Sequence, residues 1–363
     1  MALPMPHLWP MLNFDADGLP LIRPCLHFEA HVAWAEGPEI LDFYEKARST
    51  LGALLTHTDA GARKLVPVSP RTDALVPTWC AAPTPAPKKI YQCHMQGGDR
   101  GVSEATLDID FAMRRYERPT PAQVELAWRN PNSAPWLRTS VVRVTFPLDH
   151  PMAAPEAFLR WLQSLKILNE ARTVSATAGF AINVELANPP ASAFETVRDR
   201  ASAQLLRFPG LDAASTALGV GTDLFQRCFE YMDFMGEAVG RPYIKRVNWL
   251  TFLTEDQVRF IGGADALHRR LSEMPAIRLH PVGKGLLVQA GPTPRLGDVT
   301  ENDVPPEYCL VADALQRLRL PRIKAHSLNA EFRLDGCRRW LSMLEGCSSA
   351  AASAMRRVTL EAP

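Results

Sequence analysis

The sequence predicts a mixed α/β (α+β) fold, in which mainly antiparallel sheets carry helices packed on one face. Some segments alternate polar and apolar residues, which is typical of strands. Between them lie segments in which apolar residues recur at helical spacing. The order strand, helix, strand, strand recurs late in the chain, which indicates repeated β-α-β-β units. A chain of 363 residues that is 47% hydrophobic and 22% charged also buries a large core.

The first expected elements follow one another closely. Residues 20–35 mix alternation with apolar runs and predict a long strand or hairpin, which Gly37 and Pro38 end. Residues 39–55 place apolar side chains about 3.6 positions apart, so we expect an amphipathic helix there. Residues 66–88 hold six prolines and show no periodicity, which predicts a long loop.

The rest of the chain continues this alternation. Strands are predicted over residues 90–95, 105–113, 139–146 and, as one or two strands, 173–186, and helices over residues 155–168 and 193–208. The late part is predicted as a strand over 246–253, helices across 255–274, a strand over 277–282, a turn at Gly283-Lys284-Gly285 and a strand over 286–290. The turn suits a tight hairpin because glycine tolerates positive φ.

One domain is expected to take up the whole chain, residues 1–363. The alternative is a division into two subdomains, an N-terminal β-α-β part over residues 1–190 and a C-terminal part over residues 191–345. The tail over residues 346–363 is expected to fray.

Charge and targeting signals limit the partners. Lys and Arg number 40 against 39 Asp and Glu, so the net charge of +1 creates no field that attracts nucleic acid or an anionic membrane. No apolar run reaches the roughly 18 to 20 residues of a membrane-spanning helix. Residues 1–18 lack the basic start of a signal peptide, and the seven scattered cysteines form no CxxC pair. We therefore expect a soluble, cytoplasmic protein with reduced thiols.

The run from His27 to His31 is the strongest candidate for a metal site. On a strand, His27, Glu29 and His31 share one face, and three such side chains suit a metal ion. However, a strand separates the two histidines by about 13 Å, at about 3.3 Å per residue, and their order differs from the zinc motif HExxH. The preferred interpretation is a solvated or partner-facing row without a metal.

Other signatures of catalysis are missing from the sequence. It contains no GxSxG motif, and its glycine pairs lack the remaining residues of a phosphate loop. Cys93 and His94 would point to opposite faces of a strand, which favours a buried structural cysteine. Asp108 and Asp110 share a strand face, as pairs on exposed faces commonly do. We therefore expect no catalytic residue and no cofactor.

Motifs late in the chain resemble a known family. The chain reads RVNWLTFL from Arg246, then Gly262-Gly263, then GLLVQAGPTPRLGDV from Gly285 to Val299, then Pro-Pro-Glu-Tyr ending at Tyr308. Together these resemble the type VI secretion immunity family once known as a domain of unknown function. The resemblance is strongest over residues 246–318 and looser around Leu21 and residues 236–243.

This resemblance implies a cytosolic protein, made beside a type VI effector, that neutralises the toxin by binding and occluding it. The toxic domain of such effectors is often a nuclease of the restriction-endonuclease-like kind. The family has no catalytic residues to carry over and uses no cofactor. Within the motif, Trp249, Leu250 and Phe252 are expected in the core rather than at the contact.

Two acidic stretches are candidates for toxin contact, because the rim of a cleft that binds phosphate is expected to be basic. The first stretch, between Gly297 and Tyr308, has no Lys or Arg, and its acids are Asp298, Glu301, Asp303 and Glu307. The second stretch, residues 222–236, mixes acids with aromatic side chains, as interface hot spots do. Its candidates are Asp223, Glu230, Asp233, Phe229 and Tyr231. The structural alternatives are a solvated loop for the first and an amphipathic helix with buried aromatics for the second.

Two other functions stay open at this point. One is a metal-dependent or other small-molecule enzyme with its site around His27, Glu29 and His31, which metal analysis would separate from an immunity protein. The other is an adaptor that loads an effector onto the secretion apparatus without blocking its toxicity, which a nuclease assay would distinguish.

Overall fold

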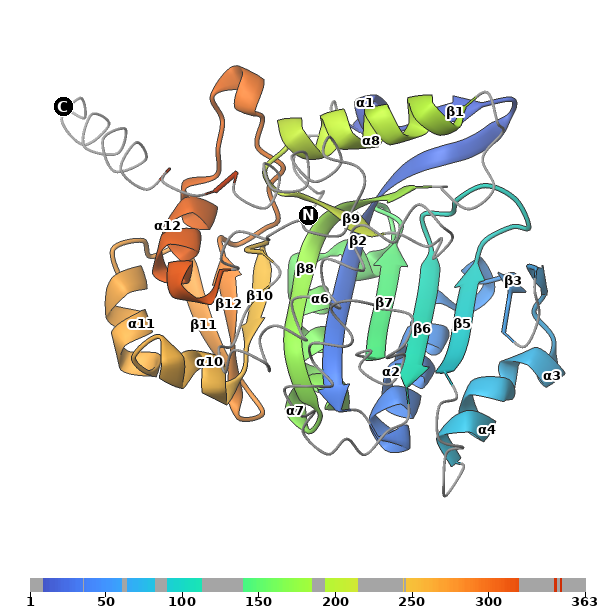
Figure 1. Ribbon diagram of the computed structural model, residues 1–363, viewed down its shortest axis with the longest axis horizontal. Helices are drawn as coiled ribbons and strands as arrows, with labels where there is room; N and C mark the ends of the chain where they lie inside the picture. The colour runs from blue at the N-terminus through green and yellow to red at the C-terminus, as the bar shows by residue number, and fades with distance from the viewer. Residues whose placement is uncertain are drawn as a thin grey trace, which may run out of the picture.

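A computed structural model describes residues 9–34, 36–60, 64–81, 90–112, 140–184, 193–214, 244, 246–319, 343–344 and 347. Its strands are β1 (Phe14–Ala16), β2 (Leu19–Trp34), β3 (His57–Thr58), β4 (Val66–Pro67), β5 (Ile90–Gln96), β6 (Thr106–Ala112), β7 (Ser140–Phe146), β8 (Arg172–Val184), β9 (Leu211–Ala214), β10 (Leu250–Leu253), β11 (Ile277–Val282) and β12 (Gly285–Ala290). They form one 12-stranded sheet in the order β11-β12-β10-β8-β2-β7-β6-β5-β3-β4, with β1 beside β2 and β9 beside β8 (Figure 1). The pairing is antiparallel except between β8 and β9.

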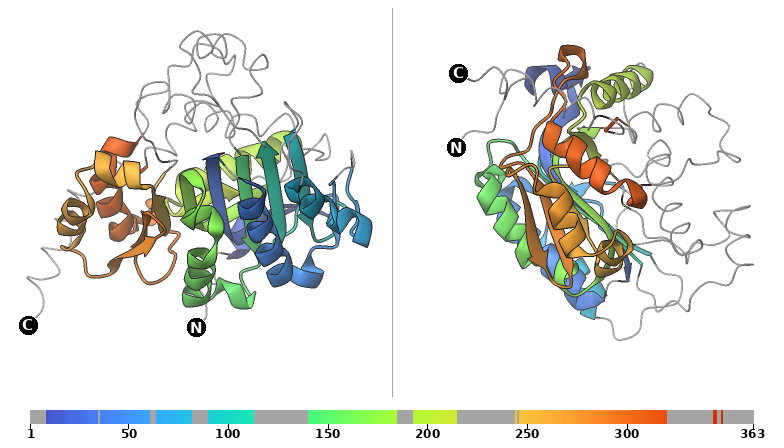
Figure 2. Two further views of the ribbon diagram at one scale, coloured as in Figure 1. Left: turned by 90° about the horizontal axis from the view of Figure 1, so that it is seen from below. Right: turned by 90° about the vertical axis from the view of Figure 1, so that its left-hand side faces the viewer.

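The helices are α1 (Trp9–Leu12), α2 (Gly37–Leu51), α3 (Pro70–Asp73), α4 (Leu75–Ala81), α6 (Pro155–Ser164), α7 (Lys166–Asn169), α8 (Phe194–Arg207), α10 (Glu255–Phe260), α11 (Ala264–Leu271) and α12 (Pro306–Ala314). Short 3-10 turns are η2 (Gly52–Leu54), η5 (Pro151–Ala153), η6 (Val299–Glu301) and η7 (Gln316–Leu318). Helices α2, α6 and α7 lie together on one face of the sheet (Figures 1 and 2). None of the helices in the described residues is long and apolar enough to cross a membrane.

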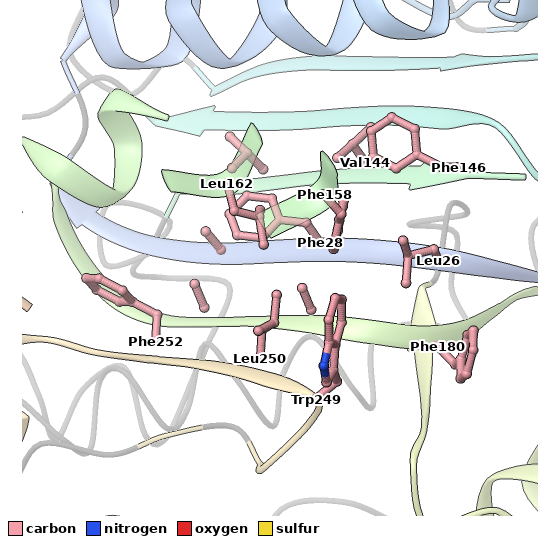
Figure 3. Close-up of a cluster of buried hydrophobic side chains, with 14 of the residues drawn as sticks. Leu26, Phe28, Val144, Phe146, Phe158, Leu162, Phe180, Trp249, Leu250 and Phe252 are labelled. Atoms are coloured by element: carbon pink, nitrogen blue, oxygen red, sulfur yellow. The ribbon is translucent and has the colours of Figure 1, made fainter. Parts of the chain in front are cut away.

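An aromatic core joins the sheet to these helices (Figure 3). Phe28 of β2 lies with ring centroids 6.2 Å from both Phe43 of α2 and Trp161 of α6. Phe158 of α6 stacks on Trp249, which precedes β10, at 6.1 Å. The expected burial of Trp249, Leu250 and Phe252 is confirmed, because their exposed fractions are 0%, 0% and 3%. Burial of such large rings is a main source of core stability.

The predicted fold class is confirmed: the sheet is antiparallel apart from one pair, and helices α2, α6 and α7 pack together on one of its faces. Residues 20–35 form a single strand, β2, and residues 173–186 also give one strand, β8. The late unit runs from β10 through α10 and α11 to the hairpin of β11 and β12. That hairpin turns through Gly283, whose φ of +54° fits the expected tight turn.

The prediction of one loop over residues 66–88 is wrong for residues 66–81. They contain β4, α3 and α4, and residues 82–88 lie outside the described residues. Ser69 caps α3 by accepting a hydrogen bond from the Thr72 amide, and Pro70 occupies the first helical turn. Proline is tolerated at that position because the amide it lacks would have no partner within the helix.

The predicted strand over residues 246–253 begins later, at Leu250. Before it, the Asn248 side chain accepts a hydrogen bond from the Trp249 amide, and the Arg246 guanidinium donates to the carbonyl oxygens of Pro209 and Leu211. Such side-chain bonds to the backbone compete with strand pairing.

The sheet is continuous across residue 190, because β8 pairs with both β9 and β10. The division into residues 1–190 and 191–345 stays a prediction. Of the tail predicted to fray from residue 346, only Cys347 lies within the described residues.

Candidate functional site

The first acidic stretch runs from the segment after β12 into the first turn of α12, and it contains the orange loop that rises beside α8 in Figure 1. We call residues 297–308 the acidic loop. Two backbone hydrogen bonds close it, from the Asp298 amide to the Asp303 carbonyl oxygen (2.6 Å) and from the Asp303 amide back to Asp298 (2.9 Å). Gly297 and Asn302 adopt positive φ angles of 65° and 56° at the bends. The loop therefore has a defined shape.

Asp298 ties the loop to the end of α8. The Arg207 guanidinium donates two hydrogen bonds to Asp298 Oδ2, at 2.6 and 2.9 Å, while Oδ1 accepts from the Thr300 amide and hydroxyl. Asp298 is 4% exposed. Its bond to Arg207 holds the pKa of this carboxyl down, at about 2, so its charge is neutralised within the molecule.

Arg295 pairs with two more of the predicted acids. Its guanidinium lies 2.8 Å from Asp303 Oδ1 and 3.5 Å from Glu307 Oε2. The Arg295 amide also donates to the hydroxyl of Tyr308, at 3.1 Å. The stretch has no basic residue of its own, but the fold brings two arginines to it from outside.

The tip of the acidic loop, residues 299–302, is exposed. The apolar side chain of Val299 is 42% exposed, and Glu301 is exposed close to it in the same turn. Glu301 forms none of the ion pairs found among the described residues. Of the four predicted acids, Glu301 therefore presents its charge most directly to solvent.

The second stretch lies outside the described residues. Its candidates Asp223, Glu230, Asp233, Phe229 and Tyr231 are therefore not placed by the structure.

His27, Glu29 and His31 do share one face of β2, but the expected solvated row is wrong. Their exposed fractions are 0%, 1% and 5%. Arg143, opposite Glu29 on β7, donates to Glu29 Oε2 at 2.6 and 2.8 Å, and His31 Nε2 lies 3.0 Å from Glu29 Oε1. Since both faces of this central strand are buried, its polar side chains contact each other instead of water.

His27 is bonded separately from that group. Its Nδ1 lies 3.2 Å from the Gly179 carbonyl oxygen and its Nε2 lies 3.5 Å from Asp212 Oδ2. The backbone packs closely here, because a Cβ atom at Gly179 would overlap with the Asn248 side chain. In the described part of the chain, no three His, Cys, Asp or Glu side chains form a group that could hold a metal ion.

Asp108 and Asp110 are also buried, at 6% and 5% exposed, so the expected exposed pair is wrong. Asp108 Oδ1 lies 2.6 Å from His94 Nδ1, and His94 Nε2 lies 3.3 Å from the Gln96 side-chain oxygen. Burial alone lowers the pKa of His94, but the charge and hydrogen bond of Asp108 outweigh it and raise the pKa to about 9. Cys93 is buried on the other face, as expected for a structural cysteine, and burial raises its pKa.

Sequence reasoning missed the arginines that organise both regions, namely Arg143, Arg207, Arg246 and Arg295. Only Arg295 and Arg246 lie in the motifs noted above, and Arg207 is 91 residues from its partner Asp298. Nothing in the local pattern signals such a long-range pair.

This fold is similar to that of a type VI secretion protein of known structure. The Pseudomonas aeruginosa T6SS protein PA0821 aligns with a TM-score of 0.66 at 18% sequence identity, over 96% of this chain and 92% of that chain. At this identity the likeness shows the fold. No curated protein matches the sequence.

Residues 123–342 match the TsiV family, described as type VI immunity for VRR-NUC. Because this match spans more than half of the chain, the protein belongs to the TsiV family. The resemblance drawn from the late motifs is thereby confirmed.

Proposed function

We propose that this protein binds a cognate type VI effector with a VRR-NUC nuclease domain and neutralises it in the cytoplasm by occluding the active site. Membership of the TsiV family is the observation that carries the proposal. In this proposal the protein makes and breaks no bond itself and needs no cofactor.

The acidic loop supports the proposal by its shape and chemistry. It is closed by its own backbone bonds and tied to the body through Arg207 and Arg295. A rigid loop loses little conformational entropy on binding. We propose that Glu301 faces the basic rim of the nuclease, with Asp303 and Glu307 beside it, while Asp298 shapes the loop.

A second contact is needed for tight binding. A nanomolar complex corresponds to about −12 kcal/mol, and a standard interface buries roughly 1,600 Å² in total. One loop is too small for that area. The stretch that holds Asp223, Glu230, Asp233, Phe229 and Tyr231 remains our prediction for a further contact.

The test uses the purified full chain and the nuclease domain of the effector encoded beside its gene. We expect a stable complex on size-exclusion chromatography and loss of plasmid cleavage near an equimolar ratio. Co-expression should rescue cells from the toxin, and continued killing despite a soluble complex would contradict the proposal.

The same experiment separates an adaptor from an inhibitor. An adaptor would co-elute with the nuclease domain and leave plasmid cleavage unchanged. An enzyme acting on a small molecule would form no complex.

A further inference from the structure

Single exposed apolar side chains are common on protein surfaces, whereas several on one surface mark a contact site. Among the described residues, Met11, Leu54 and Val299 stand out, with exposed fractions of 46%, 41% and 42%. Met11 and Val299 are 288 positions apart in the sequence, yet both belong to segments that are bonded to the last two turns of α8.

Two side chains of α8 make these connections. Gln204 donates a hydrogen bond to the Met11 carbonyl oxygen at 2.9 Å, and Arg207 holds Asp298, the residue before Val299. Residues three apart on a helix lie on the same side, with Cβ atoms about 5 to 6 Å apart. Figures 1 and 2 place α1, α8 and the acidic loop at the same end of the molecule.

Helix α8 and the base of the acidic loop are packed closely against the rest of the protein. Val197, Ala201 and Leu205 anchor α8 to the core, with exposed fractions of 0%, 8% and 4%. The base of the acidic loop docks on the residues after α8, where the Gly210 amide donates to the Leu296 carbonyl oxygen at 2.7 Å. A Cβ atom at Gly210 would collide with the Arg295 carbonyl oxygen, so the approach is close.

We propose that Met11, the C-terminal half of α8 and the tip of the acidic loop form one docking surface, and that its occupant is the nuclease domain of the cognate effector. This inference rests on the proposed function and names the surface that carries it out. We call it the α8 surface. Val299 and Met11 supply apolar contact, and Glu301 supplies one negative charge suited to a phosphate-binding rim.

The shape favours this occupant over a second copy of the chain. The loop is a projection, and a nuclease binds its substrate in a concave cleft, so the two are complementary. A self-contact whose two-fold axis passes through the loop tip would instead bring Glu301 near its own copy, where like charges repel.

The experiment compares three substitutions of the same kind. Met11→Asp and Val299→Asp each place a charge on the α8 surface, while Leu54→Asp makes the same change at the third exposed apolar residue, in η2. All three positions are exposed, so the variants should keep the thermal midpoint of the wild type. The Gln204 bond to residue 11 uses the backbone and is retained.

Affinity for the purified nuclease domain is measured by calorimetry, together with inhibition of plasmid cleavage. We expect Met11→Asp and Val299→Asp each to weaken binding about tenfold or more, and Leu54→Asp to change it less than twofold. Glu301→Lys should slow association and reduce its dependence on salt.

The outcomes separate this inference from the proposed function. If the wild type inhibits the nuclease but Met11→Asp and Val299→Asp bind as tightly as the wild type, the α8 surface is wrong and the proposed function stands. The same holds if Leu54→Asp is equally harmful, or if the wild type self-associates in ultracentrifugation and Val299→Asp does not. If the wild type fails to bind the nuclease domain at all, the proposed function itself falls.

Discussion

The pKa of His94 shows how neighbours in the sheet change the ionisation of a single residue. Both ring nitrogens face acceptors, the Asp108 carboxylate at 2.6 Å and the Gln96 side-chain oxygen at 3.3 Å. Such a pair of acceptors suits an imidazolium, because only the protonated ring donates from both nitrogens. The His94 pKa of about 9, against an ordinary value of 6.5, agrees with that state.

A pH dependence of stability follows from His94. Because its pKa is raised in the folded state, its stabilising contribution is complete below pH 6.5 and is lost as the pH rises through about 9. We expect the free-energy difference between wild type and His94→Gln in urea unfolding to shrink across that window, by on the order of 3 kcal/mol. A difference that stays constant from pH 6 to pH 10 would show that His94 is not charged in the folded protein.

Cross-strand neighbours explain why the charged side chains of β2 and β6 can be buried. Glu29 lies opposite Arg143 in the register of β2 and β7, and Asp108 lies opposite Arg143 in that of β6 and β7. A buried charge is costly unless it is paired and hydrogen-bonded. Removing Arg143 would therefore leave Glu29 buried without its guanidinium partner, whereas Asp108 would keep its pair with His94.

At the scale of elements, the acidic loop depends on contacts with α8 and with the start of α12. Asp298 joins it to Arg207, and Asp303 and Glu307 join it to Arg295. The sequence of this segment is typical of a solvated loop, but these ion pairs hold it in one conformation. The acids of the loop therefore have two roles. Asp298, Asp303 and Glu307 stabilise the loop, and Glu301 faces solvent.

Asp298→Asn tests this element. The pKa of Asp298 is lowered to about 2, so its contribution is present above the ordinary value of 3.8 and is lost as the pH falls through about 2. At pH 7 we expect the substitution to lower the free energy of unfolding by about 1 kcal/mol, since Arg207 is partly exposed and the pair is screened.

The loop should also become easier to cleave by a protease in the Asp298→Asn variant. Glu301→Gln is the matched control, because Glu301 is exposed and lies in the same loop. Equal cleavage rates in both variants would mean that the Arg207 pair does not order the loop.

At the scale of the whole molecule, Trp249 connects early and late parts of the chain. Its ring stacks on Phe158 of α6, and its Nε1 donates to the Gly291 carbonyl oxygen at the start of the segment that leads to the acidic loop, at 3.0 Å. It is fully buried. The core, the sheet and the base of the loop thus meet at one side chain.

Trp249→Ala is expected to lower the free energy of unfolding by about 3 to 5 kcal/mol, the usual cost of removing a large buried ring. Because β8 pairs with both β9 and β10, we expect one cooperative transition in calorimetry that moves to lower temperature. Two separated transitions would instead favour the division into residues 1–190 and 191–345. Leu54→Asp serves as the control, with an unchanged midpoint.

Much of the fold was predictable because local pattern decides it. The alternation in β2, the helical spacing in α2 and the glycine turn between β11 and β12 each depend on neighbours in the sequence. Residues 66–81 depart from the predicted loop because a proline is also compatible with a helix start, and Pro70 lies in the first turn of a capped helix. Residues 246–249 depart from the predicted strand because the side chains of Asn248 and Arg246 bond to the backbone.

The sequence by itself determined the fold class, the buried aromatics of the late motif and the family, since these follow from periodicity and from a run of specific residues. Only the tertiary structure decided which charges are free to meet a partner. Arg207 and Arg295 neutralise acids that look exposed in the sequence, and β2 buries a row of polar side chains that looks solvated. The reason is that charge pairing acts through space, between residues that the order of the chain leaves far apart.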